Sequence, residues 1–330
     1  MGATRVVEPA GTTRLSGGWP IEPGDALVVA TSGSTGTPKG VILTHDAVAA
    51  SAEATSQRLG VGPDDHWLAC LPLSHVGGLS VITRALHTGT PLTVHPGFDH
   101  QAVMASGATM VSLVATTLAR IDPSVFRTIV IGGSRPPAER PPNSVATYGM
   151  TETGSGVVYD GMPLKGVKVR IVDGLIELNG PMLLRGYRDG TTPIDADGWL
   201  STGDLGHLDD DGGLRVEGRA ADLIITGGEN VWPEPVEEAI RTEVGVADVA
   251  VVGRADPEWG HAVTAVIVPV DPSMPPSLDA IRNGVKAVLP AYCAPRRIEY
   301  VRALPRTGLG KLRRHEIPDG SSAGSSEPLD

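Results

Sequence analysis

The decisive stretch of the sequence reads Thr31-Ser32-Gly33-Ser34-Thr35-Gly36-Thr37-Pro38-Lys39-Gly40, between the apolar runs Ala26–Ala30, expected to be a buried strand, and Val41–Leu43. Its glycines permit backbone angles that turn successive N–H groups toward one anion. Its hydroxyl groups and the Lys39 ammonium add hydrogen-bond donors and positive charge at the same place. The Gly-Lys-Ser/Thr of a Walker loop is absent from it. We interpret the stretch as a phosphate-binding loop; a solvated loop rich in Ser, Thr and Gly is the alternative.

The stretch resembles the phosphate-binding loop of the adenylate-forming (AMP-binding) superfamily, which contains acyl-CoA synthetases, luciferases and the adenylation domains of peptide synthetases. Its Thr-Pro-Lys-Gly ending strengthens the resemblance. The resemblance implies that ATP is bound here, by Thr31, Ser32, Gly33, Ser34, Thr35, Gly36 and Lys39.

The composition is that of a globular chain long enough for two domains. Its 330 residues are 41% hydrophobic and 20% charged, which is ordinary for such proteins. The formal net charge of −11 argues against a general nucleic-acid-binding surface. With only two cysteines, Cys70 and Cys293, neither a disulfide framework nor a cysteine metal cluster is expected. No apolar run approaches the length of a membrane span and no signal pattern opens the chain, so we expect a cytoplasmic protein.

Alternating helical and extended patterns predict an α/β fold. The alanine-rich segment His45–Leu59 favours a helix, and a second helix is expected at Leu79–Leu86 after a turn at Pro72–Gly78. Short apolar runs predict strands at 66–71, 91–94, 109–113, 128–131 and 144–147. Because these strands alternate with helices, we expect β-sheets flanked by helices and a largely parallel sheet. From residue 157 the pattern changes to short β segments and turns.

We expect two domains and a tail. Residues 1–217 are the ATP- and acyl-binding core domain, residues 218–317 a small mobile α+β lid domain, and residues 318–330, rich in Gly, Ser, Asp and Glu, a disordered tail. In the lid domain, Pro233 and the acidic residues after it predict a helix within 231–243. Full-length members of the resembled superfamily carry a long segment before the phosphate loop, so the N-terminal part is expected to be shortened, in a compact member or a fragment.

A second motif, Tyr148-Gly149-Met150-Thr151-Glu152-Thr153, follows the strand predicted at 144–147. A turn there offers an aromatic face, hydroxyl groups and one carboxylate; alone it is a weak signal, because a turn needs only the glycine. In the resembled superfamily the motif packs on the nucleotide, and its glutamate holds Mg²⁺ against the ATP phosphates. The resemblance therefore implies nucleotide contacts for Tyr148, Gly149 and Thr151, and a catalytic, metal-binding role for Glu152. Phosphate-bound Mg²⁺ commonly uses one or two carboxylates.

A third motif, Ser201-Thr202-Gly203-Asp204, ends in a carboxylate that can accept two hydrogen bonds from a ribose. An Asx turn is the alternative, and the resemblance implies the ribose role for Asp204. Gly218-Arg219 and the later Gly227-Gly228 resemble the hinge and first lid strands of the superfamily. They imply that Arg219 meets the ribose or a phosphate and that Gly228 borders the pantetheine tunnel. Ala221 stands where many members carry Asp or Lys, so we expect a hinge without a side-chain latch there.

The stretch Pro305-Arg306-Thr307-Gly308-Leu309-Gly310-Lys311-Leu312 is the second strong signal. Two glycines make a loop that can deliver one lysine, and an ammonium group stabilises the charge that develops on a phosphate under attack. The adenylation lysine of the superfamily matches Lys311. Read alone, the stretch is a basic, solvated tail.

The acid substrate is inferred from Leu71–Leu79, which corresponds to the acyl pocket of the superfamily. Amino-acid-activating domains carry an aspartate hereabouts, and its absence argues for an acid without an α-amino group. His75-Val76-Gly77-Gly78 followed by Arg84 is similar to o-succinylbenzoate–CoA ligases, where an arginine at the matching offset meets the succinyl carboxylate. A guanidinium can bind such a carboxylate in a bidentate pair. The resemblance implies substrate binding by His75 and Arg84, with a catalytic role for His75 in orienting the acyl group or gating its tunnel. An exposed helix position is the alternative for Arg84.

Together the motifs imply an ATP-dependent acid–CoA ligase that forms an acyl-adenylate and then an acyl-CoA thioester. ATP, Mg²⁺ and coenzyme A are the implied cofactors, and the favoured acid is o-succinylbenzoate, in menaquinone biosynthesis. Two alternatives stay open: a CoA ligase for another aromatic or medium-chain carboxylic acid, and a non-catalytic nucleotide-binding homologue. No nucleic acid or membrane partner is expected. The sequence is compatible with a homodimer but does not define the oligomeric state.

Overall fold

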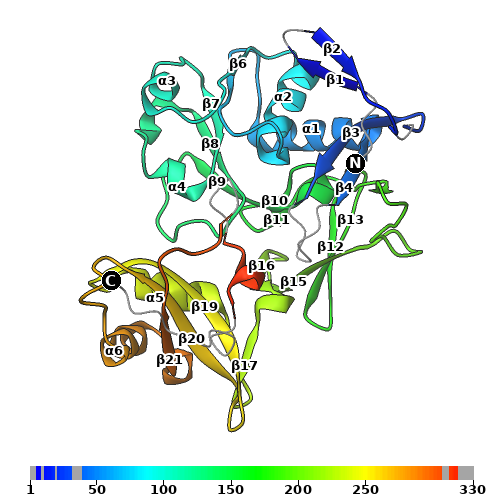
Figure 1. Ribbon diagram of the computed structural model, residues 1–330. Coiled ribbons are helices and arrows are strands. Elements are labelled where there is room, and N and C mark those ends of the chain that lie inside the picture. The colour runs from blue at the N-terminus through cyan, green and yellow to red at the C-terminus, as the bar shows by residue number, and fades with distance from the viewer. Residues whose placement is uncertain (1–4, 9–10, 19–20, 32–38, 307–311, 319–330) are drawn as a thin grey trace. The chain divides into compact units, whose positions relative to one another are not determined.

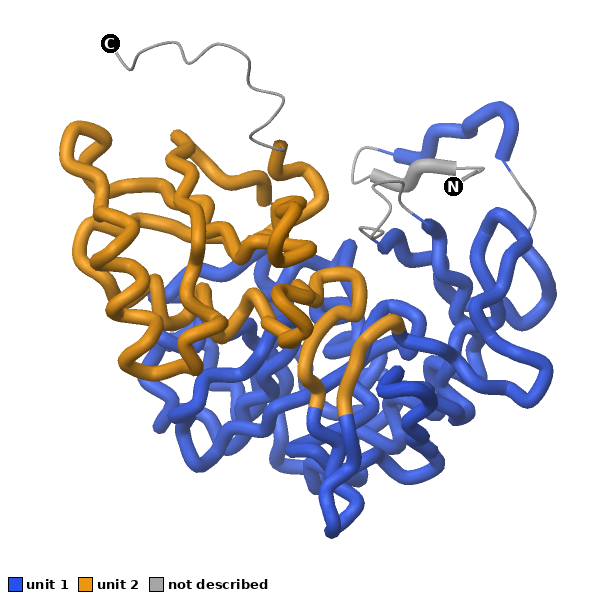
Figure 2. The backbone as a smooth tube through the Cα atoms, turned by 90° about the horizontal axis from the view of Figure 1, so that it is seen from below, with its two compact units in different colours: residues 1–202, 207–215 blue, residues 203–206, 216–330 orange. Residues whose placement is uncertain are grey.

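The computed structural model describes residues 5–8, 11–18, 21–31, 39–306 and 312–318 (Figure 1). The chain divides into two compact units, coloured separately in Figure 2. The first comprises Met1–Thr202 and His207–Arg215, and the second comprises Gly203–Gly206 and Val216–Asp330. The domain boundary that the sequence suggests between residues 217 and 218 stays a prediction. The predicted disordered tail lies outside the described residues apart from Pro318.

The first unit contains a seven-stranded sheet. Its strands are β5 Trp67–Ala69, β6 Leu92–Val94, β7 Met110–Leu113, β8 Thr128–Ile131, β9 Ser144–Gly149, β10 Gly156–Tyr159 and β11 Met162–Pro163. They lie in the order β11-β10-β9-β8-β7-β5-β6. The pairs β6–β5, β5–β7, β7–β8 and β8–β9 are parallel, whereas the pairs β9–β10 and β10–β11 are antiparallel. Every residue of the inner strand β8 is buried, as expected when helices cover both faces of a sheet. The predicted α/β class is confirmed.

Four helices connect or flank these strands, namely α1 His45–Leu59, α2 Val76–Thr88, α3 His100–Met104 and α4 Ala115–Leu118. The bounds of α1 are those predicted, because both ends are determined locally. The Thr44 hydroxyl accepts a hydrogen bond from the Ala47 amide at 3.1 Å, and Gly60 ends the helix in the left-handed conformation. The buried face of α1 also bonds to β10, since the hydroxyls of Thr55 and Tyr159 are 3.2 Å apart.

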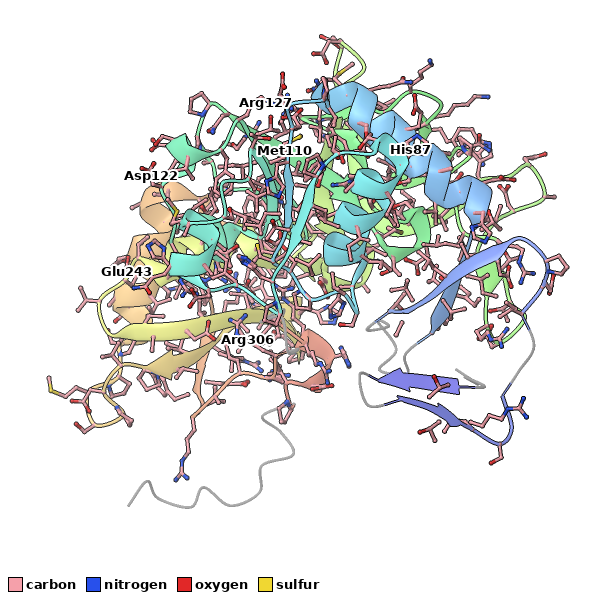
Figure 3. All side chains as sticks on the ribbon, turned by 90° about the horizontal axis from the view of Figure 1, so that it is seen from above. His87, Met110, Asp122, Arg127, Glu243 and Arg306 are labelled. Carbon is pink, nitrogen blue, oxygen red and sulfur yellow. The ribbon has the colours of Figure 1, made fainter. Side chains whose placement is uncertain are left out.

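An ion pair between the buried Asp65 and the exposed Arg127 joins the amino ends of three strands in this sheet. The Asp65 carboxylate accepts hydrogen bonds from Arg127 Nε at 2.8 Å and Nη2 at 2.6 Å. It also accepts bonds from the Thr109 hydroxyl at 2.9 Å and the Gly62 amide at 2.8 Å. Arg127 Nη2 lies 3.3 Å from the Met110 sulfur (Figure 3). Because these residues precede or begin β5, β7 and β8, the pair ties the starts of the strands together.

A three-stranded antiparallel sheet holds the ends of the predicted phosphate loop. It consists of β3 Asp25–Ala30, β4 Gly40–Thr44 and β14 Gly186–Tyr187, with β4 in the middle. The expectation that 26–30 is a buried strand is wrong, because β3 lies at the edge of this sheet and Val28 is 36% exposed. The buried strand is β4. Arg185, next to β14, pairs with Asp25 at the start of β3, at 2.9 Å from Nε to Oδ1.

The remaining strands of the first part of the chain form hairpins. Strands β1 Arg5–Glu8 and β2 Gly11–Arg14 pair antiparallel, and so do β12 Lys168–Val172 and β13 Leu175–Asn179. Strands β15 Leu200–Leu208 and β16 Leu214–Arg219 each contribute residues to both units. Thr202 at the start of β15 donates its hydroxyl hydrogen to the Ile176 carbonyl of β13 at 2.8 Å.

The second unit is a small α+β fold. Its strands are β17 Ile224–Thr226, β18 Glu229–Val231, β19 Val246–Asp256, β20 Gly260–Pro269 and β21 Arg297–Tyr300. They lie in the order β18-β17-β20-β19, with β21 parallel to β20. Helices α5 Pro233–Arg241 and α6 Leu278–Val288 cover one face through a core that includes Val236, Ile240, Val249, Val251, Val263, Ile267, Ile281 and Val285. The predicted helix at 231–243 is α5, which begins at Pro233.

Two further features bear on where the protein works. Cys70 and Cys293 are buried and free. In the described part of the chain, no helix is both long enough and apolar enough to cross a membrane.

Candidate active site

The predicted phosphate loop is closed at its base by the backbone. The Thr31 amide donates a hydrogen bond to the Lys39 carbonyl at 2.9 Å, next to the pair Ala30–Gly40 of β3 and β4. Ser32, Gly33, Ser34, Thr35 and Gly36 lie outside the described residues. Thr31 and Lys39 are therefore the predicted ATP-binding residues of this loop whose location the structure gives.

Tyr187 lies between two of the predicted site residues. Its hydroxyl donates to Glu152 Oε1 at 3.0 Å, and the Lys39 ammonium nitrogen lies 4.5 Å from the centre of its ring. The structure thus brings Lys39 and Glu152, which are far apart in the sequence, to the same aromatic side chain. Sequence analysis did not single out Tyr187. No local pattern marks it, because its place depends on the pairing of β14 with β4.

Glu152 is held by its own backbone. It lies in a 3₁₀ turn, Thr151–Thr153, in which the Thr153 hydroxyl donates to the Ser155 carbonyl at 2.6 Å. The Leu184 amide donates to the Glu152 carbonyl at 2.8 Å. The carboxylate therefore projects from a backbone that is bonded on both sides.

Tyr148 and Gly149 belong to β9 rather than to a turn after it, which corrects the sequence prediction. The half-buried Tyr148 pairs with Val158 of β10 in the ladder. A side chain at position 149 would collide with the Ser155 carbonyl. Glycine is therefore required there by the close approach of β9 and β10.

A magnesium ion fits this arrangement if the nucleotide brings most of its ligands. The described residues contain no group of three or more His, Cys, Asp or Glu side chains that could hold a metal ion. Within the same residues, Glu152 Oε2 has no hydrogen-bond partner, whereas Oε1 is bonded to Tyr187. Mg²⁺ in nucleotide sites is commonly bound by one or two carboxylates together with waters and phosphate oxygens. One carboxylate oxygen directed away from protein donors suits that mode of binding.

His75 and the glycines after it begin helix α2. His75 is half-buried, has extended backbone angles and directly precedes the helix. The helix therefore starts at Val76, three residues earlier than the sequence indicates, and residues 76–78 are helical rather than a turn. A side chain at Gly78 would lie 2.5 Å from the Leu71 carbonyl oxygen, so α2 packs directly on the backbone that leaves β5.

Arg84 is buried, with 3% of its surface exposed, so the alternative of an exposed helix position is wrong. Its guanidinium carbon lies 5.6 Å from the centre of the Trp67 ring, and Nη1 lies 3.5 Å from the Ser112 hydroxyl. Among the described residues it has no carboxylate partner, and its Nε has no hydrogen bond. Trp67 is the first residue of β5, whereas His75 follows the carboxyl end of that strand. Arg84 and His75 thus lie toward opposite ends of α2.

In the second unit, Asp204 and Arg219 are joined directly. Arg219 Nε lies 2.9 Å from Asp204 Oδ1, and the Asp204 side chain is 9% exposed. Asp204 lies within strand β15, not in an Asx turn. Gly228 is exposed in the turn between β17 and β18. Ala221 lies in a short 3₁₀ turn, Ala220–Asp222, whose last residue is Asp222.

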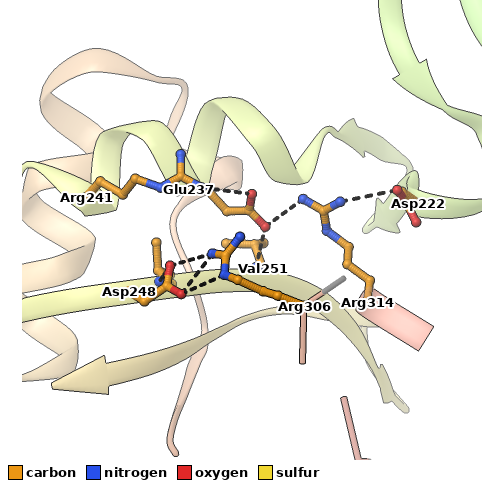
Figure 4. A network of polar contacts seen from close by, with 8 residues as sticks. Asp222, Glu237, Arg241, Asp248, Val251, Arg306 and Arg314 are labelled. Atoms are coloured by element: carbon orange, nitrogen blue, oxygen red, sulfur yellow. Dashed lines mark hydrogen bonds and ion pairs between the residues drawn. The ribbon is translucent and has the colours of Figure 1, made fainter. Parts of the chain in front are cut away.

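The described residues on both sides of Lys311 are anchored by ion pairs (Figure 4). Before it, Arg306 Nη2 lies 2.7 Å from Asp248 Oδ1 of β19. After it, Arg314 Nη2 lies 2.7 Å from the buried Glu237 Oε1, and Nη1 lies 3.3 Å from Asp222 Oδ2. Lys311 itself lies outside the described residues.

Family models match both parts of the chain. Residues 17–187 match the model described as AMP-binding enzyme, and residues 235–311 match the AMP-binding enzyme C-terminal domain. The chain therefore belongs to the AMP-binding enzyme family.

Relatives within the family narrow the comparison. A probable 2-succinylbenzoate–CoA ligase of Mycobacterium tuberculosis (strain CDC 1551 / Oshkosh) is 42% identical over 320 residues, which cover 88% of this chain and 82% of that protein. The o-succinylbenzoate CoA synthetase of Bacillus subtilis, solved with the acyl-adenylate intermediate OSB-AMP, has 32% identity and a TM-score of 0.80, over 88% of this chain and 68% of that one. The same synthetase, solved with ATP and magnesium ion, has 31% identity and a TM-score of 0.80, over 91% of this chain and 72% of that one.

Proposed function

We propose that this chain is an AMP-forming acid–CoA ligase that acts on 2-succinylbenzoate (o-succinylbenzoate), in menaquinone biosynthesis. The observation that carries the proposal is the 42% identity to the probable 2-succinylbenzoate–CoA ligase over 88% of the chain. The structural similarity to a synthetase solved with OSB-AMP supports the same acid. The cluster of Lys39, Tyr187 and Glu152 supports the use of ATP with magnesium.

The reaction has two half-reactions. In the first, a carboxylate oxygen of the acid attacks the α-phosphorus of ATP, and pyrophosphate leaves, which gives the acyl-adenylate. In the second, the CoA thiol loses its proton and its sulfur attacks the acyl carbon, and AMP leaves, which gives the thioester. Every atom of ATP is recovered in AMP and pyrophosphate, and AMP also carries the oxygen with which the acid attacked the α-phosphorus.

Different residues of the chain are proposed to bind different parts of ATP and its magnesium ion. Lys39 and Thr31 bind phosphate oxygens at the base of the loop, and Glu152 holds the magnesium ion that accompanies ATP. When bound, that ion neutralises phosphate charge and orients the leaving group. Asp204 accepts hydrogen bonds from the ribose hydroxyls, Arg219 contacts the ribose or a phosphate, and Lys311 stabilises the charge that develops during adenylation.

Binding of the second carboxylate is assigned to Arg84. The buried guanidinium without a carboxylate partner in the described chain supports this role, because burying an unpaired charge is costly. The role makes a geometric demand. The acid has to present its second carboxylate to the guanidinium beside Trp67 while its first carboxylate reacts with ATP. Packing of Arg84 on Trp67 is the competing role, and the substrate comparison in the Discussion separates the two.

Location and assembly belong to the same proposal. The free thiols of Cys70 and Cys293 support a reducing compartment, the cytoplasm. Coenzyme A is the proposed thiol substrate, and Gly228 is proposed to border its pantetheine arm. A homodimer stays a prediction, which light scattering of the purified protein tests.

The proposal is tested by incubating the purified protein with MgATP, CoA and a panel of acids. We expect pyrophosphate release and thioester formation with o-succinylbenzoate, at an efficiency at least about 10-fold above that with benzoate or medium-chain acids. Turnover of a different acid in preference would reassign the substrate. A folded protein that binds MgATP but turns over no carboxylic acid would reject the ligase assignment.

A further inference from the structure

The contacts of Tyr187 point to a role that the assignments above do not include. Its hydroxyl bonds to Glu152 and its ring faces Lys39. We propose that Tyr187 is a positioning residue that keeps the Glu152 carboxylate available to the magnesium ion and the Lys39 ammonium available to phosphate. The inference rests on the proposed function only in taking MgATP as the ligand of this site.

The tyrosine is well placed to hold other groups because its own backbone is fixed on both edges. Strand β14 pairs with β4, with Tyr187 opposite Val41. The Tyr187 amide donates to the Thr191 carbonyl at 2.7 Å, and the next amide, of Arg188, donates to the Gly40 carbonyl at 2.7 Å. Residue 40 follows Lys39 directly. The backbones that carry the ring and the lysine are therefore part of one hydrogen-bonded ladder.

The hydroxyl of Tyr187 acts as a donor to Glu152. A phenolic hydroxyl has an ordinary pKa of about 10 and is protonated at neutral pH, so in this contact the Tyr187 hydroxyl donates and the carboxylate accepts. A protonated hydroxyl fixes which carboxylate oxygen is occupied. Oε1 accepts from Tyr187, and the orientation that this bond imposes presents Oε2 to a cation. Groups that orient a metal ligand in this way typically change metal affinity by about 10- to 100-fold when they are removed.

The ring separates two opposite charges. No ion pair joins Lys39 to Glu152 within the described residues, although both side chains contact Tyr187. A direct ion pair would compete with phosphate for the ammonium and with magnesium for the carboxylate. The aromatic face instead attracts the ammonium through its negative π surface, and the ring edge carries the hydroxyl to the carboxylate. Tyr187 thus binds each charged group while preventing the two from neutralising each other.

The test compares Tyr187→Phe, Tyr187→Leu and a matched control, Tyr159→Phe. Tyr159 is fully buried and its hydroxyl bonds to Thr55 at 3.2 Å, so the control loses a similar bond within the same unit. Binding of ATP is measured by calorimetry, once with magnesium and once with EDTA, in the absence of any acid. The magnesium dependence of pyrophosphate exchange is the second readout.

We expect Tyr187→Phe to weaken binding of MgATP by about 10-fold while binding of metal-free ATP changes less than about twofold. Tyr187→Leu, which also loses the ring, should weaken both. The control should change neither. In a Glu152→Gln background, Tyr187→Phe should add no further magnesium effect, because the ligand that it orients is gone.

Two results overturn the proposal. Tyr187→Phe with wild-type magnesium dependence would show that the hydroxyl does not orient Glu152. Equal weakening with and without magnesium would assign Tyr187 to the structure of the sheet. Failure of the proposed ligase function is seen separately, as a wild-type protein that binds MgATP but makes no thioester, and it leaves the binding comparison intact.

Discussion

The guanidinium of Arg84 lies over the ring of Trp67, with 5.6 Å between the guanidinium carbon and the ring centre. Both side chains are buried, and Trp67 Nε1 and Arg84 Nε have no hydrogen-bond partner in the described chain. A buried cation stacked on an aromatic ring is attracted to it, but that attraction does not replace a counter-ion. In the described chain the Arg84 charge is therefore without a counter-ion, which an anionic ligand could supply.

Replacing Arg84 separates substrate recognition from packing. Arg84→Met keeps much of the aliphatic stem and removes the charge. If the guanidinium binds the distal carboxylate, its loss costs roughly 2–5 kcal/mol. At roughly 1.4 kcal/mol per decade, kcat/KM for o-succinylbenzoate should fall by at least about 30-fold. Efficiency with benzoate-like acids should change less than about twofold. A parallel fall for both substrates would assign Arg84 to packing on Trp67.

Lys311→Ala tests whether the two half-reactions use different residues. We expect the rate of adenylation, measured as pyrophosphate release, to fall by about 100-fold or more, because a group that stabilises transition-state charge is lost. Thioester formation from supplied acyl-adenylate should stay within about threefold of wild type. Lys286→Ala, an exposed lysine on α6, is the matched control and should leave both steps unchanged. Equal losses in the two steps would contradict a lysine that serves adenylation alone.

Glu237→Ala should destabilise the second unit. Glu237 is 2% exposed, and its Oε1 accepts bonds from the Val251 amide at 2.8 Å and Arg314 Nη2 at 2.7 Å. Removing it strands a largely buried guanidinium and an amide, a loss of about 3–5 kcal/mol for a buried ion pair. Urea unfolding or limited proteolysis measures the change. Glu238→Gln, at the exposed neighbouring position, should cost less than about 0.5 kcal/mol; a comparable loss there would contradict the assignment.

The Asp65–Arg127 pair makes the free energy of unfolding depend on pH. Burial raises the pKa of Asp65, but the bonds from Arg127, Gly62 and Thr109 together lower it below its usual value. The ionised group therefore contributes stability that is fully present above the usual pKa of about 3.9 and is lost as the pH falls through the lower folded pKa.

Asp65→Asn removes that contribution. We expect the variant to be about 1–3 kcal/mol less stable than wild type between about pH 6 and 8. The difference in unfolding free energy between wild type and the variant should become smaller below about pH 4, because only wild type then loses an ion pair. Asp64→Asn, at the exposed neighbouring residue, is the control. Urea unfolding at several pH values measures both; a gap that does not depend on pH would contradict the pair's role.

Sequence patterns predicted those parts of the fold that are determined locally. Helix α1 has the predicted bounds because a capping threonine and a terminal glycine lie next to it in the chain. Helix α2 begins before the predicted start, because Gly77-Gly78 suggests a turn when read locally. The reason for glycine at position 78 is tertiary: a side chain there would meet the Leu71 carbonyl. For the same reason the edge location of β3 was missed, since it depends on which strands pair with β4.

The candidate site was likewise predicted only where its residues belong to local sequence motifs. Lys39 and Glu152 were marked by motifs, and the structure brings both to one side chain. Tyr187, which joins them, carries no motif, because it reaches the site only through the long-range pairing of β14 with β4. The burial of Arg84 was likewise undecided by the sequence, where helical spacing allowed both an inward and an exposed position. Its packing on Trp67 decides it.

The pairing of β14 with β4 also determines how early during translation this sheet can form. Residues 40–44 leave the ribosome more than a hundred residues before Gly186–Tyr187, their antiparallel partner. At about 5–20 residues per second, the nascent chain keeps one edge of β4 open for roughly 7–30 s. An open strand edge of this kind is a template for association with other chains. The sheet that carries Lys39 and Tyr187 can thus close only after residues 186–187 have been synthesised, and the yield of folded protein in cells depends on how well the open edge of β4 is protected during translation.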